Sequence, residues 1–237
     1  MPETFAALLF AHVLADFIFQ TNRMVAHKRR LPVMLAHVGI VGVAAVALSG
    51  AFHPVLLALT LAHLGIDLVK AHASRRGLAP FLADQVAHTL TLGLAAFAAP
   101  DLWASGVWAQ ITALPALMAL IAGLIVTTRA GGMAVGMLMA PWAAATPEGL
   151  LGGGKAIGLL ERGLIFLLVL TGQAAGIGFL IASKSVLRFG TVADDRKVSE
   201  YVIIGTLASF AWAIAAAFAT LALLAALPPL GIADLST

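Results

Sequence analysis

The stretch TFAALLFAHVLADFIFQT, residues 4–21, decides the fold. It is apolar over almost the length that a membrane-crossing helix needs, which is about 20 residues. It nevertheless contains His12 and Asp16. An ionisable group at the centre of a bilayer costs about 3 kcal/mol or more, so such residues usually have partners and a function. A spacing of four places this imidazole and this carboxylate one helical turn apart on the same face.

The same pairing recurs further along the chain. His63 and Asp67, and then Asp84 and His88, are also four residues apart in apolar stretches, and His37 lies in another. Four imidazoles and three carboxylates can hold one tetrahedral or octahedral metal ion, or two ions that share a bridging aspartate. We therefore predict an intramembrane metal site whose ligands are His12, Asp16, His63, Asp67, Asp84 and His88. In an enzyme, His37 would be a further ligand or a base and Asp84 a general base.

The composition is that of a membrane protein. Of the 237 residues, 61% are hydrophobic and 11% are charged, whereas soluble domains carry about 25% charged residues. The chain has no cysteine, so a metal site must use nitrogen and oxygen ligands. Such ligands favour zinc and also suit manganese, iron or magnesium. The pI of about 9.7 is better explained by basic loops at a membrane surface than by nucleic-acid binding.

Apolar runs bounded by charged residues, Pro or Gly predict an all-α bundle of seven to eight spans in one domain, residues 1–237. The runs near 4–21, 32–50, 54–73 and 80–99 give residues 1–99 four helices with the His/Asp cluster, and residues 100–237 hold the rest. Charge counting favours eight spans, in which 114–145 crosses twice and turns at Arg129; runs near 156–183 and 200–227 follow. Basic residues in the first and third loops predict an N-terminus outside and a multi-pass protein of a bacterial inner (plasma) membrane.

This topology places each aspartate nearer the cytoplasm than its histidine. Other polar residues carry weaker signals. Lys70 would orient Asp67 or meet an anionic headgroup, although a lysine at a helix end often only extends to the membrane surface. Lys184 and Arg188 form a candidate headgroup patch, with Glu200 holding Arg188 or Arg196. Gln20 is a candidate outer-sphere residue or an interfacial amide.

Several motifs resemble a known bacterial membrane family, domain of unknown function 3307. These are the segment from Ala11 to Thr21, His63-x-x-x-Asp67-x-x-Lys70 and Asp84-Gln85-x-x-His88. The C-terminal half is similar to longer family members at Gly158–Arg162, Ala182–Arg188 and Glu200–Ser209. The resemblance supports grouping these residues and implies little about a substrate. The pattern also has a distant analogy with small membrane-bound metal-dependent hydrolases and with seven-span zinc lipid amidases.

Three functions remain open from the sequence. The favoured one is a metal-dependent hydrolase that acts on a lipid or lipid-linked substrate near the cytoplasmic face, through a metal-activated water. The second is a divalent-cation or proton-coupled transporter, since His/Asp chains also relay ions. The third is a structural helper subunit, in which the pairs only bridge helices. Assembly as a homo-oligomer is left open.

Overall fold

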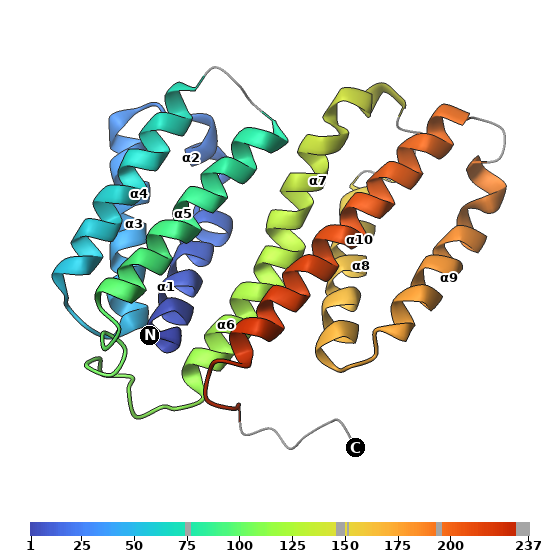
Figure 1. Ribbon diagram of the computed structural model, residues 1–237. Coiled ribbons are helices and arrows are strands. Elements are labelled where there is room, and N and C mark those ends of the chain that lie inside the picture. The colour runs from blue at the N-terminus through green and yellow to red at the C-terminus, as the bar shows by residue number, and fades with distance from the viewer. Residues whose placement is uncertain (74–76, 146–149, 151, 193–195, 231–237) are drawn as a thin grey trace. The chain divides into compact units, whose positions relative to one another are not determined.

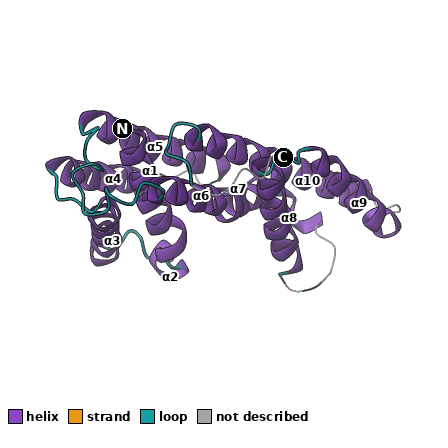
Figure 2. Ribbon diagram, turned by 90° about the horizontal axis from the view of Figure 1, so that it is seen from below, coloured by secondary structure: helices purple, strands orange, loops and turns teal. Residues whose placement is uncertain are grey.

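The computed structural model describes residues 1–73, 77–145, 150, 152–192 and 196–230, without the side chains of 144, 145 and 187–192. Its regular elements are all helices, and no strand occurs within these residues (Figure 2). The chain divides into two units (Figure 1). Unit 1 holds Met1–Ala122 and the segment that begins at Ala222, and unit 2 runs from Gly123 to Leu221.

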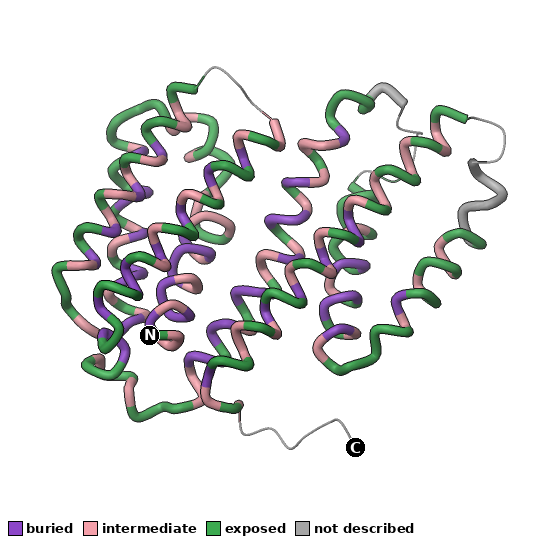
Figure 3. Tube along the Cα trace, viewed as in Figure 1, coloured by how far each residue is buried: buried purple, intermediate pink, exposed green. Residues whose placement is uncertain are grey.

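Four long helices build unit 1. They are α1 (Pro2–Leu14) with its π-helical continuation η1 (Ala15–Phe19), α3 (Leu31–Ser49), α4 (Pro54–His72) and α5 (Leu78–Ala98). Helices α1 and α4 each pack against α3 and α5. Buried stretches alternate with exposed ones along these helices (Figure 3), as expected where one side faces the bundle and the other faces lipid.

Local signals set the ends of these helices. Pro32 and Pro54 lie in the first turns of α3 and α4, where a missing backbone N–H costs nothing. α3 ends at Gly50, whose φ of 67° is the left-handed conformation that glycine adopts easily. After η1 the chain is extended at Gln20, and the Thr21 hydroxyl caps the short helix α2 (Asn22–Ala26) by accepting from the Met24 N–H at 3.3 Å.

The rest of the chain is also helical. It forms α6 (Leu114–Ile125), the π-helical turn η2 (Val126–Ala130), α7 (Gly131–Met139), the 3₁₀ helix η3 (Ala140–Ala145), α8 (Gly153–Leu170), α9 (Ala175–Val192) and α10 (Arg196–Leu224). Carbonyl groups of η2 accept hydrogen bonds from side chains of unit 2. The Trp212 indole donates to the Val126 carbonyl at 3.0 Å, and the Arg162 guanidinium donates to the Thr128 carbonyl at 3.1 and 3.3 Å.

Six described helices are long and apolar enough to cross a membrane: Pro2–Phe19, Leu31–Ser49, Pro54–His72, Leu78–Ala98, Leu114–Ala143 and Arg196–Leu224. The first four agree with the predicted runs, but the total is below the predicted seven to eight. The predicted turn at Arg129 is wrong, because the helix continues through this residue as a π turn. The predicted run 156–183 is two helices, α8 and α9, separated near Gly172, whose φ is 71°.

Gly50 offers a direct test of how α3 ends. A Cβ there would lie 2.5 Å from the Trp108 ring, in addition to the unfavourable φ. We expect Gly50→Ala to lower the free energy of unfolding by about 2 kcal/mol, because a left-handed non-glycine residue alone costs about 1–2 kcal/mol. Thermal unfolding in detergent measures this. Gly39→Ala is the matched control: it lies in α3 with open space around it, so it should be neutral or stabilising by up to ~1 kcal/mol. Equal effects of both substitutions would contradict this packing.

Candidate metal centre

The bundle of unit 1 groups six of the seven predicted cluster residues at ligand distances from one another, and the seventh, Asp84, lies beside them with its Oδ1 3.7 Å from His88 Nδ1. α1 and η1 supply His12 and Asp16, α3 supplies His37, α4 supplies His63 and Asp67, and α5 supplies Asp84 and His88. Their side chains are at most 6% exposed. Three sets have ligand atoms within 4.8 Å of one another: His12, Asp16 and His88; Asp16, His37 and His63; and His63, Asp67 and His88.

Two imidazoles and two carboxylates form the centre of the cluster. His37 Nε2 lies 3.2 Å from His63 Nε2, 3.3 Å from Asp16 Oδ1 and 3.4 Å from Asp67 Oδ2. His63 Nε2 lies 3.6 Å from the same Asp16 oxygen and 3.5 Å from the same Asp67 oxygen. These five separations are nearly equal, so each of the two imidazole nitrogens lies close to both carboxylate oxygens.

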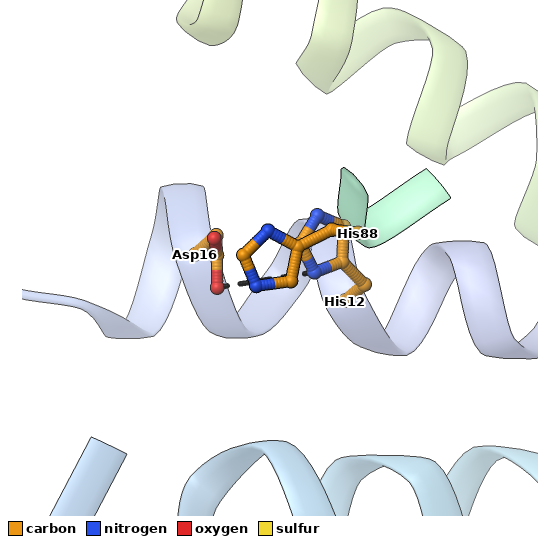
Figure 4. Close-up of side chains that lie close together, drawn as sticks. All are labelled: His12, Asp16 and His88. Atoms are coloured by element: carbon orange, nitrogen blue, oxygen red, sulfur yellow. Dashed lines mark ion pairs between the residues drawn. The ribbon is translucent and has the colours of Figure 1, made fainter. Parts of the chain in front are cut away.

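His12 and His88 lie beside this centre. Their rings stack with centroids 4.9 Å apart, and the His88 ring is 4.2 Å from that of His63. His12 Nδ1 is 3.9 Å from Asp16 Oδ1 (Figure 4). His88 Nδ1 is 2.9 Å from the backbone carbonyl of Asp84. A carbonyl can only accept, so this Nδ1 carries the proton, and Nε2 keeps its lone pair when the ring is neutral.

Several polar atoms of the cluster are buried and have no hydrogen-bond partner among the residues that the structure describes. They are both ring nitrogens of His12, His37 Nδ1, His88 Nε2, Asp16 Oδ1, Asp67 Oδ2 and Asp84 Oδ1, together with Gln20 Nε2 close by in the chain. Buried polar atoms in native proteins are nearly always bonded, and exceptions call for an explanation such as an ion or a water. The carboxylate oxygens and the Nε2 atom are of the kind that ligates metals.

Two of the aspartates bind a lysine through the carboxylate oxygen that faces away from the histidines. Lys28 Nζ lies 2.7 Å from Asp67 Oδ1, the oxygen that does not face the histidines. Lys70 donates to Asp84 Oδ2, which also accepts from Gln85 Nε2 at 3.0 Å. Each carboxylate thus gives one oxygen to a lysine, and its other oxygen has no hydrogen-bond partner in the described part of the chain. Fixing a carboxylate through its second oxygen is typical of the outer sphere of metal sites.

Some of the other polar residues have partners that differ from those predicted for them. Lys70 pairs with Asp84 across the helix interface, not with Asp67 on its own helix. Gln20 follows the last residue of η1, and its backbone is extended there. In unit 2, Lys184 bonds to Glu161 at 2.7 Å, and Glu200 bonds to Arg196 at 2.9 Å. The Arg188 side chain lies outside the described part. Sequence reasoning missed Lys28 as the partner of Asp67; its place in the basic loop after the first span was the available signal.

Fold and site together define an all-helical protein with membrane-length apolar helices and a buried cluster of histidines and aspartates. Residues 4–113 match the family described as "Protein of unknown function (DUF3307)". The match supports the resemblance to this family and includes all seven cluster residues, although it covers less than half of the chain. A comparison with curated proteins and one with solved structures found no match.

The ion pair between Lys28 and Asp67 can be tested by removing the cation. Lys28→Met keeps the aliphatic stem but leaves Asp67, 1% exposed, without its counter-charge. Breaking a buried pair costs about 3 kcal/mol or more, and we expect a loss of that size in the free energy of unfolding. The control is Arg196→Met, which breaks an exposed pair and should cost less than ~1 kcal/mol. Equal small effects would show that Lys28 does not hold Asp67.

Proposed function

We propose that unit 1 binds a divalent metal ion between Asp16, His37, His63 and Asp67, and that zinc is the metal that fits best. One observation carries the proposal. Ligands at about 2.0–2.1 Å in a tetrahedral zinc site lie about 3.3–3.4 Å from one another, and five of the six atom pairs in this set are 3.2–3.6 Å apart. Histidine nitrogen and carboxylate oxygen are ordinary zinc ligands.

The competing interpretation is that the cluster only holds helices together. Packing by hydrogen bonds should then give the buried carboxylates well-aligned bonds, yet within the described residues the imidazole nitrogens that face Asp16 Oδ1 and Asp67 Oδ2 at 3.3–3.6 Å form none. Leaving a charged oxygen buried and unsatisfied costs about 1–3 kcal/mol or more. A bound cation would remove this cost at both oxygens, which favours the metal site over the helper-subunit role.

The reaction that we propose is hydrolysis of a lipid or lipid-linked substrate. A divalent ion would polarise the scissile group and activate a water molecule. Asp84 would accept the proton, since its Oδ1 is free while Lys70 and Gln85 hold its other oxygen. His37, predicted as a ligand or a base, fits the role of a ligand because it contacts both aspartates of the centre.

An apolar groove of about 550 Å³ supports a lipid substrate. It runs between α1–η1 and α3, and its lining includes Phe19, Ala36 and Ile40, which neighbour Asp16 and His37 in the chain. The volume lies in the range of small-molecule sites, about 300–1,000 Å³. An acyl chain is the occupant that this lining suits. Lys70, whose side chain is 37% exposed, would meet the anionic headgroup.

The membrane arrangement also belongs to the proposal. The N-terminus would face outward, and the loop with Lys28 and the C-terminal end of α4, which carries Lys70, would face the cytoplasm. The plasma membrane of a bacterium would then hold the protein, with the lysine side of the cluster nearest the cytosol. The other headgroup candidates, Lys184 and Arg188, belong to α9 in unit 2.

Transport is the second candidate, and the packing beyond the histidines speaks against it. The next turns of α1, α4 and α5 contribute Leu8, Leu59 and Leu92 to an apolar cluster that also includes Ala44, Ala45 and Leu56. An ion that crossed the membrane here would have to pass this cluster. An enzyme whose substrate enters from one side needs no such path.

Metal analysis of the purified protein tests the proposal. The wild type should retain at least about one equivalent of zinc, and His37→Ala and Asp67→Asn should each lose it together with chelator-sensitive lipid hydrolysis. His72→Ala is the control, because His72 is exposed and its side-chain bond within the described residues is to the Leu68 carbonyl of its own helix; it should change neither metal content nor hydrolysis. A wild type without bound metal, or metal retained in both site variants, would overturn the proposal. Metal-dependent flux into liposomes without hydrolysis would favour the transporter.

A further inference from the structure

The proposed tetrahedral site has a chemical consequence. Four protein ligands close a tetrahedral zinc site, and closed sites are structural, whereas catalytic sites bind zinc with three protein ligands and keep one position open. A zinc ion held by the proposed set would have no open coordination position, because Asp16, His37, His63 and Asp67 fill all four. If the centre hydrolyses a bond, the water-binding ion needs ligands beyond this set.

His12 and His88 supply such ligands. His12 is 4% exposed and His88 is 1% exposed. Each ring keeps at least one nitrogen that no hydrogen bond from the described residues uses. Within the described residues, both nitrogens of His12 and the Nε2 of His88 are buried without a geometrically formed hydrogen bond. The bond from His88 Nδ1 to the Asp84 carbonyl at 2.9 Å fixes the tautomer whose Nε2 can ligate, as in many metal-binding histidines.

Asp16 connects the two groups. Its Oδ1 lies 3.3 Å from His37 Nε2 in the central set and 3.9 Å from His12 Nδ1 in the second. The π turn at Ala15–Phe19 carries this residue, and such turns often occur at functional sites. His12, Asp16 and His88 have ligand atoms within 4.8 Å of one another, a set of two histidines and one carboxylate.

A small cavity lies beside this second set. Its volume is about 10 Å³, and His12, His63 and His88 contribute to its wall. That is room for about one water molecule. The rest of the wall is mainly aliphatic, with Leu8, Val41 and Leu59 among its residues. A water-sized space therefore lies against the side chains of His12, His63 and His88.

We propose that the cluster is a two-metal centre, in which His12, His88 and Asp16 hold a second divalent ion with an open coordination position. Asp16 bridges the two ions. This inference rests on the proposed function and deepens it: the central ion is structural, and the second is the one that binds water. Ions that share a carboxylate in hydrolytic two-metal sites are about 3.5–4 Å apart.

Charge balance predicts the order of binding. With the histidines neutral, Asp16, Asp67 and Asp84 outweigh Lys28 and Lys70 by one negative charge. One bound divalent ion makes the net charge of the buried centre positive, and a second ion increases that positive charge. We therefore expect sequential loading, with the second ion bound at least about tenfold more weakly, since 1.4 kcal/mol of repulsion already amounts to that factor. An anionic substrate group would offset the added charge.

Manganese(II) titration of the full-length protein in detergent tests this inference. Electron paramagnetic resonance distinguishes an isolated Mn²⁺, with a six-line spectrum, from two exchange-coupled ions, with a broader multiline spectrum. We expect two equivalents and a coupled spectrum for the wild type. His12→Phe and His88→Phe keep a ring in the stack but remove its nitrogens, so each should leave one equivalent and a six-line spectrum.

Two results would overturn the two-metal centre. One is a single equivalent and a six-line spectrum in the wild type; the other is two coupled ions retained in the His12→Phe/His88→Phe double variant. The wild-type spectrum shows whether one ion or two coupled ions are bound, even if a variant fails to fold. His37→Phe separates this inference from the proposed function. If the wild type binds a single ion that His37→Phe loses and the double variant retains, the second site alone is rejected. A wild type without bound metal would reject both the second site and the proposed function.

Discussion

The inward-facing oxygens of the buried aspartates are the constraint on which the rest of unit 1 depends. In Asp67 and Asp84 one carboxylate oxygen bonds to a lysine and the other meets imidazoles without a hydrogen bond. The lysine fixes the orientation of the carboxylate, so its second oxygen cannot turn away from the histidines. Removing a carboxylate from water is expensive unless it is paired. Helices α3, α4 and α5 must therefore pack so that lysines reach one side of the cluster and histidines the other.

That constraint explains why the cluster lies where apolar packing ends. Leu8, Leu59 and Leu92, each one turn beyond a cluster histidine, pack into an apolar core. On the other side, the α2 segment folds back and places Lys28 against Asp67, while the Arg29 side chain donates to the Ala71 carbonyl at 2.8 Å. The layer of histidines thus separates an apolar half from a charged half. A reaction at this boundary would have water from one side and a lipid tail available from the membrane.

The sequence predicted the cluster because its signals are local. A histidine and an aspartate four residues apart share a helix face whatever the tertiary structure, and apolar length marks the first four helices. Pairings across helices are not local. The contact between Lys70 and Asp84 requires the register of α4 against α5, and that of Lys28 requires the turn after Gln20. Neither follows from spacing.

The errors in the second half of the chain have a related cause. Arg129 followed by Gly131 and Gly132 suggested a turn, but the helix absorbs this segment as a π turn. The carbonyls of Val126 and Thr128 gain partners from Trp212 and Arg162. The glycines leave space for these large side chains, since a Cβ at Gly131 would lie 2.5 Å from Trp212. Composition alone cannot distinguish a glycine that ends a helix from one that leaves space for a large side chain of another helix.

Zinc-edge X-ray absorption of the full-length protein loaded with one equivalent of zinc tests the central claim most directly. The expected spectrum has about four nitrogen or oxygen neighbours at about 2.0–2.1 Å, with outer-shell scattering from two imidazole rings. His37→Ala should reduce the imidazole scattering. A first shell of about six oxygens without imidazole scattering would contradict the account, because the zinc would then be held by water and surface carboxylates and not by this cluster.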